Sequence, residues 1–210
     1  MNHTQNYIES QKAICRDEWF SSHKASLLGE GPIEGACRVI SWQKPGTWIY
    51  GCRFIIHRRW LCVVGDIGEA TFEWGDDITL EFLAQIDFGY FLSKCRASPT
   101  GKEFQQWDSD IAWLQASDYM TELREVKAET RHSREEKELS ALNDLGEHSA
   151  REDYEHAARE IYDRTGECEL ASMVHDWGNV PSCHAIGMFV GLQQAISQLK
   201  SAVDKQMPVS

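Results

Sequence analysis

The sequence predicts an α+β protein: a four-stranded antiparallel meander covered by a helix, followed by an acidic, entirely helical C-terminal half. Residues 36–74 contain four short β-rich runs separated by turn residues. Beyond residue 78, apolar residues recur at spacings of three and four, the period of an α-helix. The charge is uneven: residues 1–98 hold 10 Lys+Arg against 12 Asp+Glu, a balance of −2, and residues 99–210 hold 11 against 21, a balance of −10.

The N-terminal region is expected to be helical up to a glycine-rich loop. Apolar residues between positions 5 and 28 follow an irregular helical pattern, which predicts one or two short helices. Three glycines and Pro32 lie between positions 29 and 35, and this composition breaks both helices and strands. The loop therefore separates the helices from the β-rich block.

The β-rich block is expected to form one sheet. Residues 48–56 alternate between two faces, one of which is strongly aromatic. Residues 60–64 are apolar throughout, which predicts a central strand covered on both faces. Residues 66–68, Asp-Ile-Gly, allow a tight turn into a last strand at 70–74. Short connections make neighbouring strands antiparallel, so these runs predict a meander.

A helix from residue 78 to residue 96 is expected to cover the sheet. Asp76 and Asp77 suit its N-terminal cap, and its apolar residues form a wide stripe. Residues 98–101, Ser-Pro-Thr-Gly, end this helix. We place a domain boundary there, so that residues 1–98 form an α+β domain and residues 99–210 a helical region.

The helical region is expected to contain amphipathic helices and one charged connector. Residues 102–126 are amphipathic, and residues 122–140 predict either a solvated helix or a flexible connector. A capping box at residues 149–152 begins a helix that ends at Gly166. The Ala185–Val203 seam repeats every three or four residues, which predicts packing on other helices or pairing with a second copy.

Two clusters have the residue types of metal ligands. The first falls within 17 residues and has zinc-ligand types without the close pairs of short zinc motifs: Cys168, His175, Cys183 and His184. The second could bind a divalent cation, although turns and helix caps also explain it: Asp66, Glu69, Asp76 and Asp77. No cysteine or serine lies in a nucleophile elbow. The sequence therefore predicts no catalytic residue, no bound metal and no cofactor.

A carboxylate-rich surface between residues 122 and 163 is the strongest candidate for interaction. Its predicted residues are Glu135, Glu136, Glu138, Asp144, Glu147, Glu152, Asp153 and Glu155. Such a surface can mimic the charges of a nucleic acid and occupy a basic groove on a protein or nucleoprotein. The same pattern also fits a solvated helix surface.

The net charge of −12 repels a phosphate backbone, so no direct nucleic-acid binding is expected. Arg58 and Arg59, with His57 and Trp60 beside them, form one compact basic spot. That spot fits either a nucleic-acid clamp or a solvated hairpin tip.

The expected location is the cytoplasm. No apolar run approaches the roughly 20 residues of a membrane helix, and the first 20 residues lack the apolar stretch of a signal peptide. Seven cysteines without a Cys-x-x-Cys pair argue for reduced thiols rather than a disulfide framework.

Several motifs resemble those of small proteins encoded by phages and prophages. They are Ser41-Trp42-x-Lys44-Pro45-Gly46-Thr47, Gly65-Asp66-x-Gly68-Glu69-Ala70 with Trp74, Tyr90-Phe91-x-x-Lys94-Cys95-x-Ala97-Ser98, Trp177-Gly178 and Gly191-Leu192-x-x-Ala195. The resemblance implies a non-enzymatic inhibitor of a bacterial defence complex, of the anti-CRISPR type, acting in the host cytoplasm. Two alternatives stay open: a metal-dependent enzyme acting on a nucleotide, and a dimeric helical scaffold joined through Ala185–Val203.

Overall fold

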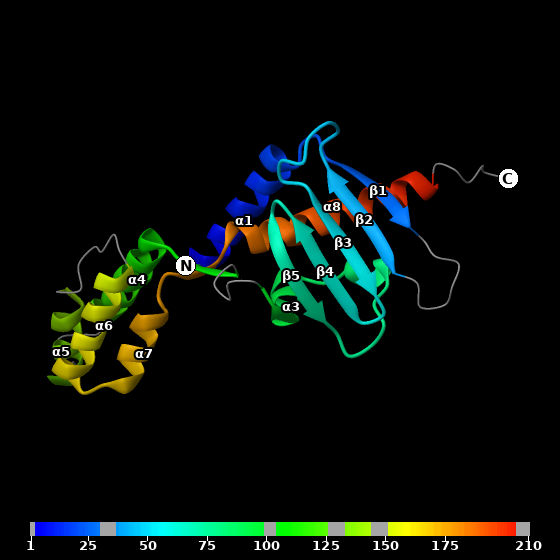
Figure 1. Cartoon of the computed structure of the whole chain (residues 1–210). Coiled ribbons are helices and arrows are strands. Elements are labelled where there is room, and N and C mark those ends of the chain that lie inside the picture. The colour runs from blue at the N-terminus through cyan, green and yellow to red at the C-terminus, as the bar shows by residue number, and fades with distance from the viewer. Residues whose placement is uncertain (1–2, 30–36, 99–103, 126–132, 144–150, 205–210) are drawn as a thin grey trace. The chain divides into compact units, whose positions relative to one another are not determined.

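The computed structural model describes residues 3–29, 37–98, 104–125, 133–143 and 151–204, and the chain divides into two compact units (Figure 1). The helical unit comprises Met1–Tyr7 and Gln106–Val180, and the sheet unit comprises Ile8–Gln105 and Pro181–Ser210. The predicted division at residue 98 differs from these units, because residues 181–210 belong with the sheet. A helix that packs on a sheet joins its unit regardless of its distance along the chain.

The sheet unit contains one antiparallel sheet of six strands in sequence order. They are β1 (Lys24–Gly29), β2 (Arg38–Gln43), β3 (Cys52–His57), β4 (Trp60–Gly65), β5 (Gly68–Glu73) and β6 (Cys95–Ala97). The sequence predicted four strands, two fewer than the sheet contains. The prediction misses β1, which lies in a segment with a partly helical pattern, and β6, which has only three residues.

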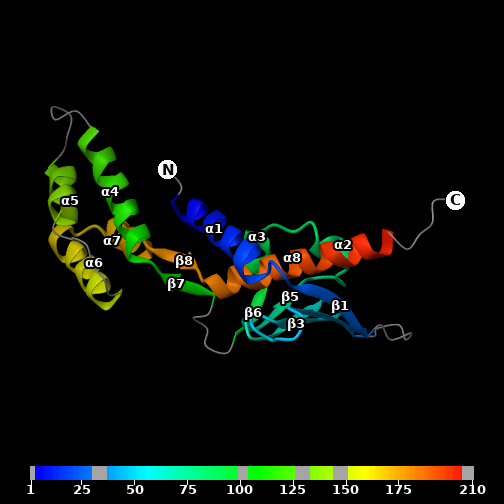
Figure 2. The same cartoon turned by 90° about the horizontal axis from the view of Figure 1, so that it is seen from above.

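One face of the sheet is buried beneath α8 (Cys183–Asp204), which packs on β1 and β2 (Figure 2). The residues Ile40, Phe54, Val63 and Ala70 form a cross-strand row on this face and are buried. Helix α8 contributes buried residues at helical spacing: Ala185, Ile186, Phe189, Leu192, Ala195 and Ile196. The seam was predicted to pack on other helices or to pair with a second copy; its residues Ala185, Phe189, Leu192 and Ile196 are buried within this chain.

The segment predicted as one covering helix is broken into three elements. Helix α2 (Leu80–Leu83) and helix α3 (Phe88–Ser93) precede strand β6. Thr79 accepts a hydrogen bond from the Phe82 amide at 3.1 Å, and Asp87 accepts one from the Tyr90 amide at 2.8 Å. These caps, rather than Asp76 and Asp77, begin the two helices.

The other face of the sheet, here called the open face, has no described helix over it (Figures 1 and 2). Its central cross-strand row is Val39, Ile55, Cys62 and Thr71, all half-buried. Val64 is 42% exposed on the same face. The prediction that residues 60–64 are covered on both faces is therefore wrong: only Leu61 and Val63 are buried within that run.

The helical unit contains α4 (Ser109–Glu125), α5 (Ser133–Asn143), α6 (Arg151–Thr165) and α7 (Cys168–Asp176). Their apolar sides form one core, which includes Ala116, Leu142, Tyr154, Ile161 and Val174. A small sheet joins β7 (Gln105–Trp107) to β8 (Asn179–Pro181), so the region after residue 98 is not entirely helical. The predicted capping box at residues 149–152 lies partly outside the described residues.

The chain before the sheet forms α1 (His3–Ile14) and a π-helical turn, η1 (Cys15–Trp19). His23 follows and is buried against Phe20 and Trp42, with ring centroids 5.1 and 5.4 Å away. Burial lowers the pKa of the His23 imidazole; the Lys44 charge lowers it further, and backbone groups of Ile49 and Tyr50 partly oppose this. The folded chain therefore keeps His23 neutral where an unfolded chain would bind a proton.

We expect the protein to lose stability as the pH falls below the ordinary histidine pKa of 6.5. The unfolded state then binds a proton that folded His23 excludes, so the free energy of unfolding decreases until the lowered pKa is reached. The variant His23→Phe should lose this part of the pH dependence. Urea unfolding at about pH 7.5 and about pH 5.5 measures both proteins. Identical pH dependence in the two would assign the effect to other groups.

Candidate functional site

The acidic charge of the chain is concentrated in one unit. The helical unit contains 8 Lys+Arg against 19 Asp+Glu, a balance of −11. The sheet unit contains 13 against 14, a balance of −1. Nearly all of the net charge of −12 therefore belongs to the helical unit.

Helices α6 and α7 hold their carboxylates outward because the opposite sides of both helices are core. In α6, Tyr154, Ala158 and Ile161 are buried. Carboxylates on the rest of α6 are exposed: Glu152, Glu160 and Asp163. In α7, Leu170 and Val174 are buried, and the exposed carboxylates are Glu169 and Asp176. The 3.6-residue period thus turns these five carboxylates, here called the acidic surface, away from the core. The cations Arg159 and Arg164 of α6 are exposed as well.

The predicted interaction residues are only partly found on exposed surface. Glu136 and Glu152 are exposed. Glu155 is half-buried and accepts a hydrogen bond from Arg151 at 2.7 Å. Asp144 and Glu147 lie outside the described residues, as do the side chains of Glu135 in α5 and Asp153 in α6.

Glu138 is a correction to the prediction, because it is only 4% exposed. It follows the exposed Lys137 in α5. The Tyr119 hydroxyl donates a hydrogen bond to the Glu138 carboxylate at 3.3 Å. A buried carboxylate needs such partners because desolvation is costly. Glu138 therefore belongs to the packing of α4 against α5 and is not available to a partner.

Two carboxylates of the helical unit have lowered pKa values. The hydrogen bond from Arg151 lowers the pKa of Glu155, and the positive charges of Arg151 and Arg159 add to the effect. A hydrogen bond from His3, at 2.9 Å, lowers the pKa of Asp118. Both shifts favour the charged form, so these carboxylates stay ionised well below neutral pH.

A hollow of about 430 Å³ lies between α6 and α7 beside the acidic surface. Its lining residues are Ala158, Arg159, Tyr162, Asp163, Ala171 and His175. Tyr162 is 46% exposed, and its ring lines the hollow together with the Asp163 carboxylate and the Arg159 guanidinium. The sequence did not reveal this residue, because Tyr162 follows the buried Ala158 by four residues, the spacing of a core position.

Neither of the two candidate metal clusters is assembled among the described residues. Among the described residues, no group of three or more His, Cys, Asp or Glu is placed to hold a metal ion. Cys168 and His175 lie in α7 of the helical unit, whereas Cys183 and His184 begin α8 of the sheet unit. Asp66 instead accepts a hydrogen bond from the Tyr50 amide at 2.7 Å, which fixes the loop between β2 and β3.

Comparisons of the chain with models of known protein families, with curated proteins and with solved structures found no match. The motifs quoted above for their resemblance contain residues that build the fold. Trp42 and Trp74 are buried, and Gly191 of α8 lies against the Trp42 ring. None of the described helices combines the length and the hydropathy that a membrane span requires.

Proposed function

We propose that this protein is a non-enzymatic inhibitor that binds a basic, nucleic-acid-binding groove of a bacterial defence complex through its helical unit. The observation that carries the proposal is the balance of −11 in that unit, against −1 in the sheet unit. Such a charge attracts a basic groove over a long range and competes with nucleic acid for it.

The spacing of the acidic surface supports mimicry of a phosphate backbone. Glu160 and Asp163 lie within one turn of α6, and one helical turn is about 5.4 Å long. A DNA strand carries one charge for about every 3.4 Å of its axis, a spacing of the same order. The hollow at Tyr162 adds a place where an arginine or lysine of the groove can rest.

The choice of a defence complex as partner rests on the resemblance of the motifs to phage and prophage proteins. An anti-CRISPR type of inhibition follows if the groove belongs to an RNA-guided nuclease. The proposal therefore has two parts that can fail separately: competition with nucleic acid through the acidic surface, and the identity of the complex.

The test measures DNA binding by purified RNA-guided nuclease complexes with and without the full chain. We expect inhibition that weakens with rising salt, because exposed charges are screened. The triple variant Glu152→Lys/Glu160→Lys/Asp163→Lys should inhibit about tenfold less or worse. A matched variant in the sheet unit, Asp17→Lys/Glu18→Lys/Asp76→Lys, changes the same charge at exposed positions and should inhibit as the wild type does.

Two results would contradict the proposal. Equal losses in the two triple variants would show that net charge, rather than the acidic surface, is responsible. No inhibition of any complex by the wild type, together with no protection of phage in cells that carry those systems, would remove the defence complex as the partner.

A further inference from the structure

The open face of the sheet has a charge opposite to that of the whole chain. Its described charged residues are four cations, Lys24, Arg53, Arg59 and Arg96, and two carboxylates, Glu69 and Glu73. The open face therefore has an excess of two positive charges in a chain of net charge −12. Repulsion of a phosphate backbone by negative charge therefore arises from the helical unit and not from this face.

Two arginines of the open face are held in place by one carboxylate. Glu73 accepts from Arg59 at 2.8 Å and from Arg96 at 3.2 Å. The side chains of Arg59 and Arg96 are 51% and 57% exposed. Each guanidinium has five N–H donors, so donors of both arginines remain directed to solvent. Paired, preoriented guanidinium groups of this kind bind phosphate oxygens.

Tryptophan rings lie beside two of these arginines. The Arg59 guanidinium is 5.8 Å from the ring centre of Trp60, and that of Arg53 is 5.6 Å from the ring centre of Trp48. Trp60 lies opposite Glu73 in the strand register, and Arg53 lies opposite Val64. The two arginine–tryptophan pairs thus lie near opposite ends of β3 and β4. Nucleic-acid bases stack on both aromatic rings and guanidinium planes.

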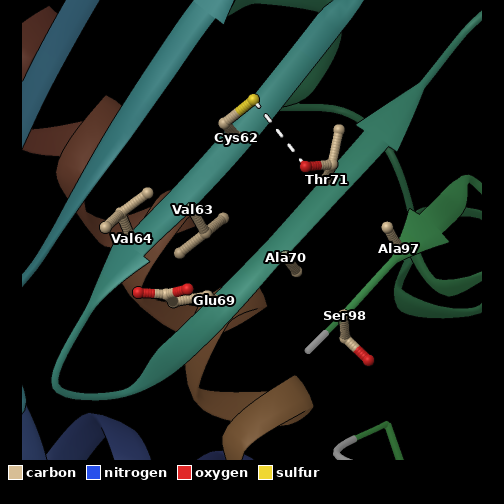
Figure 3. Close-up of a pocket in the computed structure, with 8 residues that line it drawn as sticks. All are labelled: Cys62, Val63, Val64, Glu69, Ala70, Thr71, Ala97 and Ser98. Atoms are coloured by element: carbon tan, nitrogen blue, oxygen red, sulfur yellow. Dashed lines mark hydrogen bonds between the residues drawn. The ribbon is translucent and has the colours of Figure 1, made fainter. Parts of the chain in front are cut away.

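A hollow of about 310 Å³ lies along β4, β5 and β6 (Figure 3). It is lined by Cys62, Val63, Val64, Glu69, Ala70, Thr71, Ala97 and Ser98. Most of the lining side chains are apolar, and Glu69 and Ser98 add a carboxylate and a hydroxyl. Figure 3 shows Val64 and Glu69 side by side on neighbouring strands, with Ser98 on the chain beside them. A nucleobase is a flat, largely apolar ring with N–H groups at its edge. Such a ring suits a hollow with an apolar lining and a few polar groups.

We propose that the open face binds single-stranded nucleic acid, with phosphates at Arg53, Arg59 and Arg96 and bases on Trp60 and in the hollow at Cys62–Thr71. A duplex keeps its bases stacked inside and cannot present them to a sheet face, so a single strand is the occupant that fits. This inference does not depend on the proposed function, because it concerns the other unit and another ligand.

The test is fluorescence anisotropy of labelled strands of about ten nucleotides, oligo-dT and oligo-U, with the full chain at about 50 mM salt. We expect micromolar binding, with log K falling against log salt at a slope of about −2, as for three phosphate contacts. The two strands distinguish DNA from RNA. A DNA duplex of the same length and a polyglutamate peptide serve as competitors.

Adjacent residues supply a matched pair of variants. Arg59→Glu reverses a charge on the open face and should weaken binding at least about tenfold. Arg58→Glu makes the same change in the same turn, but Arg58 lines a different hollow with Ile56 and Ile78, on the covered side. It should bind within about twofold of the wild type. Circular dichroism checks that both variants fold. Arg96→Gln provides a second, milder test, because Arg96 shares the Glu73 carboxylate with Arg59.

Three results would overturn the inference. The first is absence of binding to either strand at up to about 100 µM protein, the level of weak non-specific association. The second is an equal loss in Arg58→Glu and Arg59→Glu. The third is displacement by polyglutamate or duplex as effective as displacement by unlabelled single strand, which would show a general attraction to polyanions.

Discussion

Gly65→Ala is expected to lower the free energy of unfolding of the sheet unit by about 3 kcal/mol or more. A Cβ atom at Gly65 would overlap the carbonyl oxygen of Gly51 and lie 2.5 Å from Cα of Cys52. The obstacles are backbone atoms, and the Asp66 amide fixes the Gly51 carbonyl further by donating to it at 2.8 Å. Relief of the overlap would require β3 and β4 to separate, which breaks the centre of the sheet.

Gly75→Ala is the control for this substitution. Nothing lies within 4 Å of a Cβ built on Gly75, and the residue is exposed after β5. Its free energy of unfolding should change by no more than about 0.5 kcal/mol. Urea unfolding followed by tryptophan fluorescence compares the two. Equal stabilities would show that the sheet tolerates a methyl group at Gly65, contrary to the contact described.

Leu192→Asp is expected to unfold the sheet unit. Leu192 is fully buried on α8, and an unpaired carboxylate there costs about 4 kcal/mol or more, a large part of the total stability of a domain. Near-ultraviolet circular dichroism should lose its native signal. The matched change Ser197→Asp, at an exposed position of the same helix, should leave the fold intact.

This pair also distinguishes a core helix from a dimer interface. If α8 joined two copies through its seam, Leu192→Asp would give a folded protein of lower mass in light scattering. A folded Leu192→Asp variant would therefore contradict the assignment of Leu192 to the core, whatever its mass.

Local pattern was sufficient to predict the region of β2 to β5. Alternation in β3 places Cys52, Phe54 and Ile56 on the buried face, and tight turns join the strands. The partner of that face was not predictable in the same way. The seam on α8 shows that one side of the helix is apolar, but no local signal states that it meets a sheet more than 100 residues earlier.

The sequence predicted which region carries the negative charge, but not which carboxylates of that region are exposed. Counting residues indicates where the carboxylates are concentrated, yet it cannot tell exposed Glu136 from buried Glu138, two positions away. That difference depends on Tyr119, which arrives from α4. Likewise, the arginine clamp at Glu73 joins residues from a turn and from β6, a strand that the sequence did not reveal.

The division of the chain has a consequence for its synthesis. The sheet unit is interrupted after Gln105 and resumes at Pro181, and β7 pairs with β8 where the chain leaves and returns. During translation the six strands therefore leave the ribosome well before α8, the helix that covers them. Residues 106–180, the helical insertion, leave the ribosome in between. The helical insertion has all its residues first and can reach its native state while the sheet still lacks α8. Domains fold as units during translation. The sheet unit can therefore complete its fold only after α8 has been synthesised and packs on the strands.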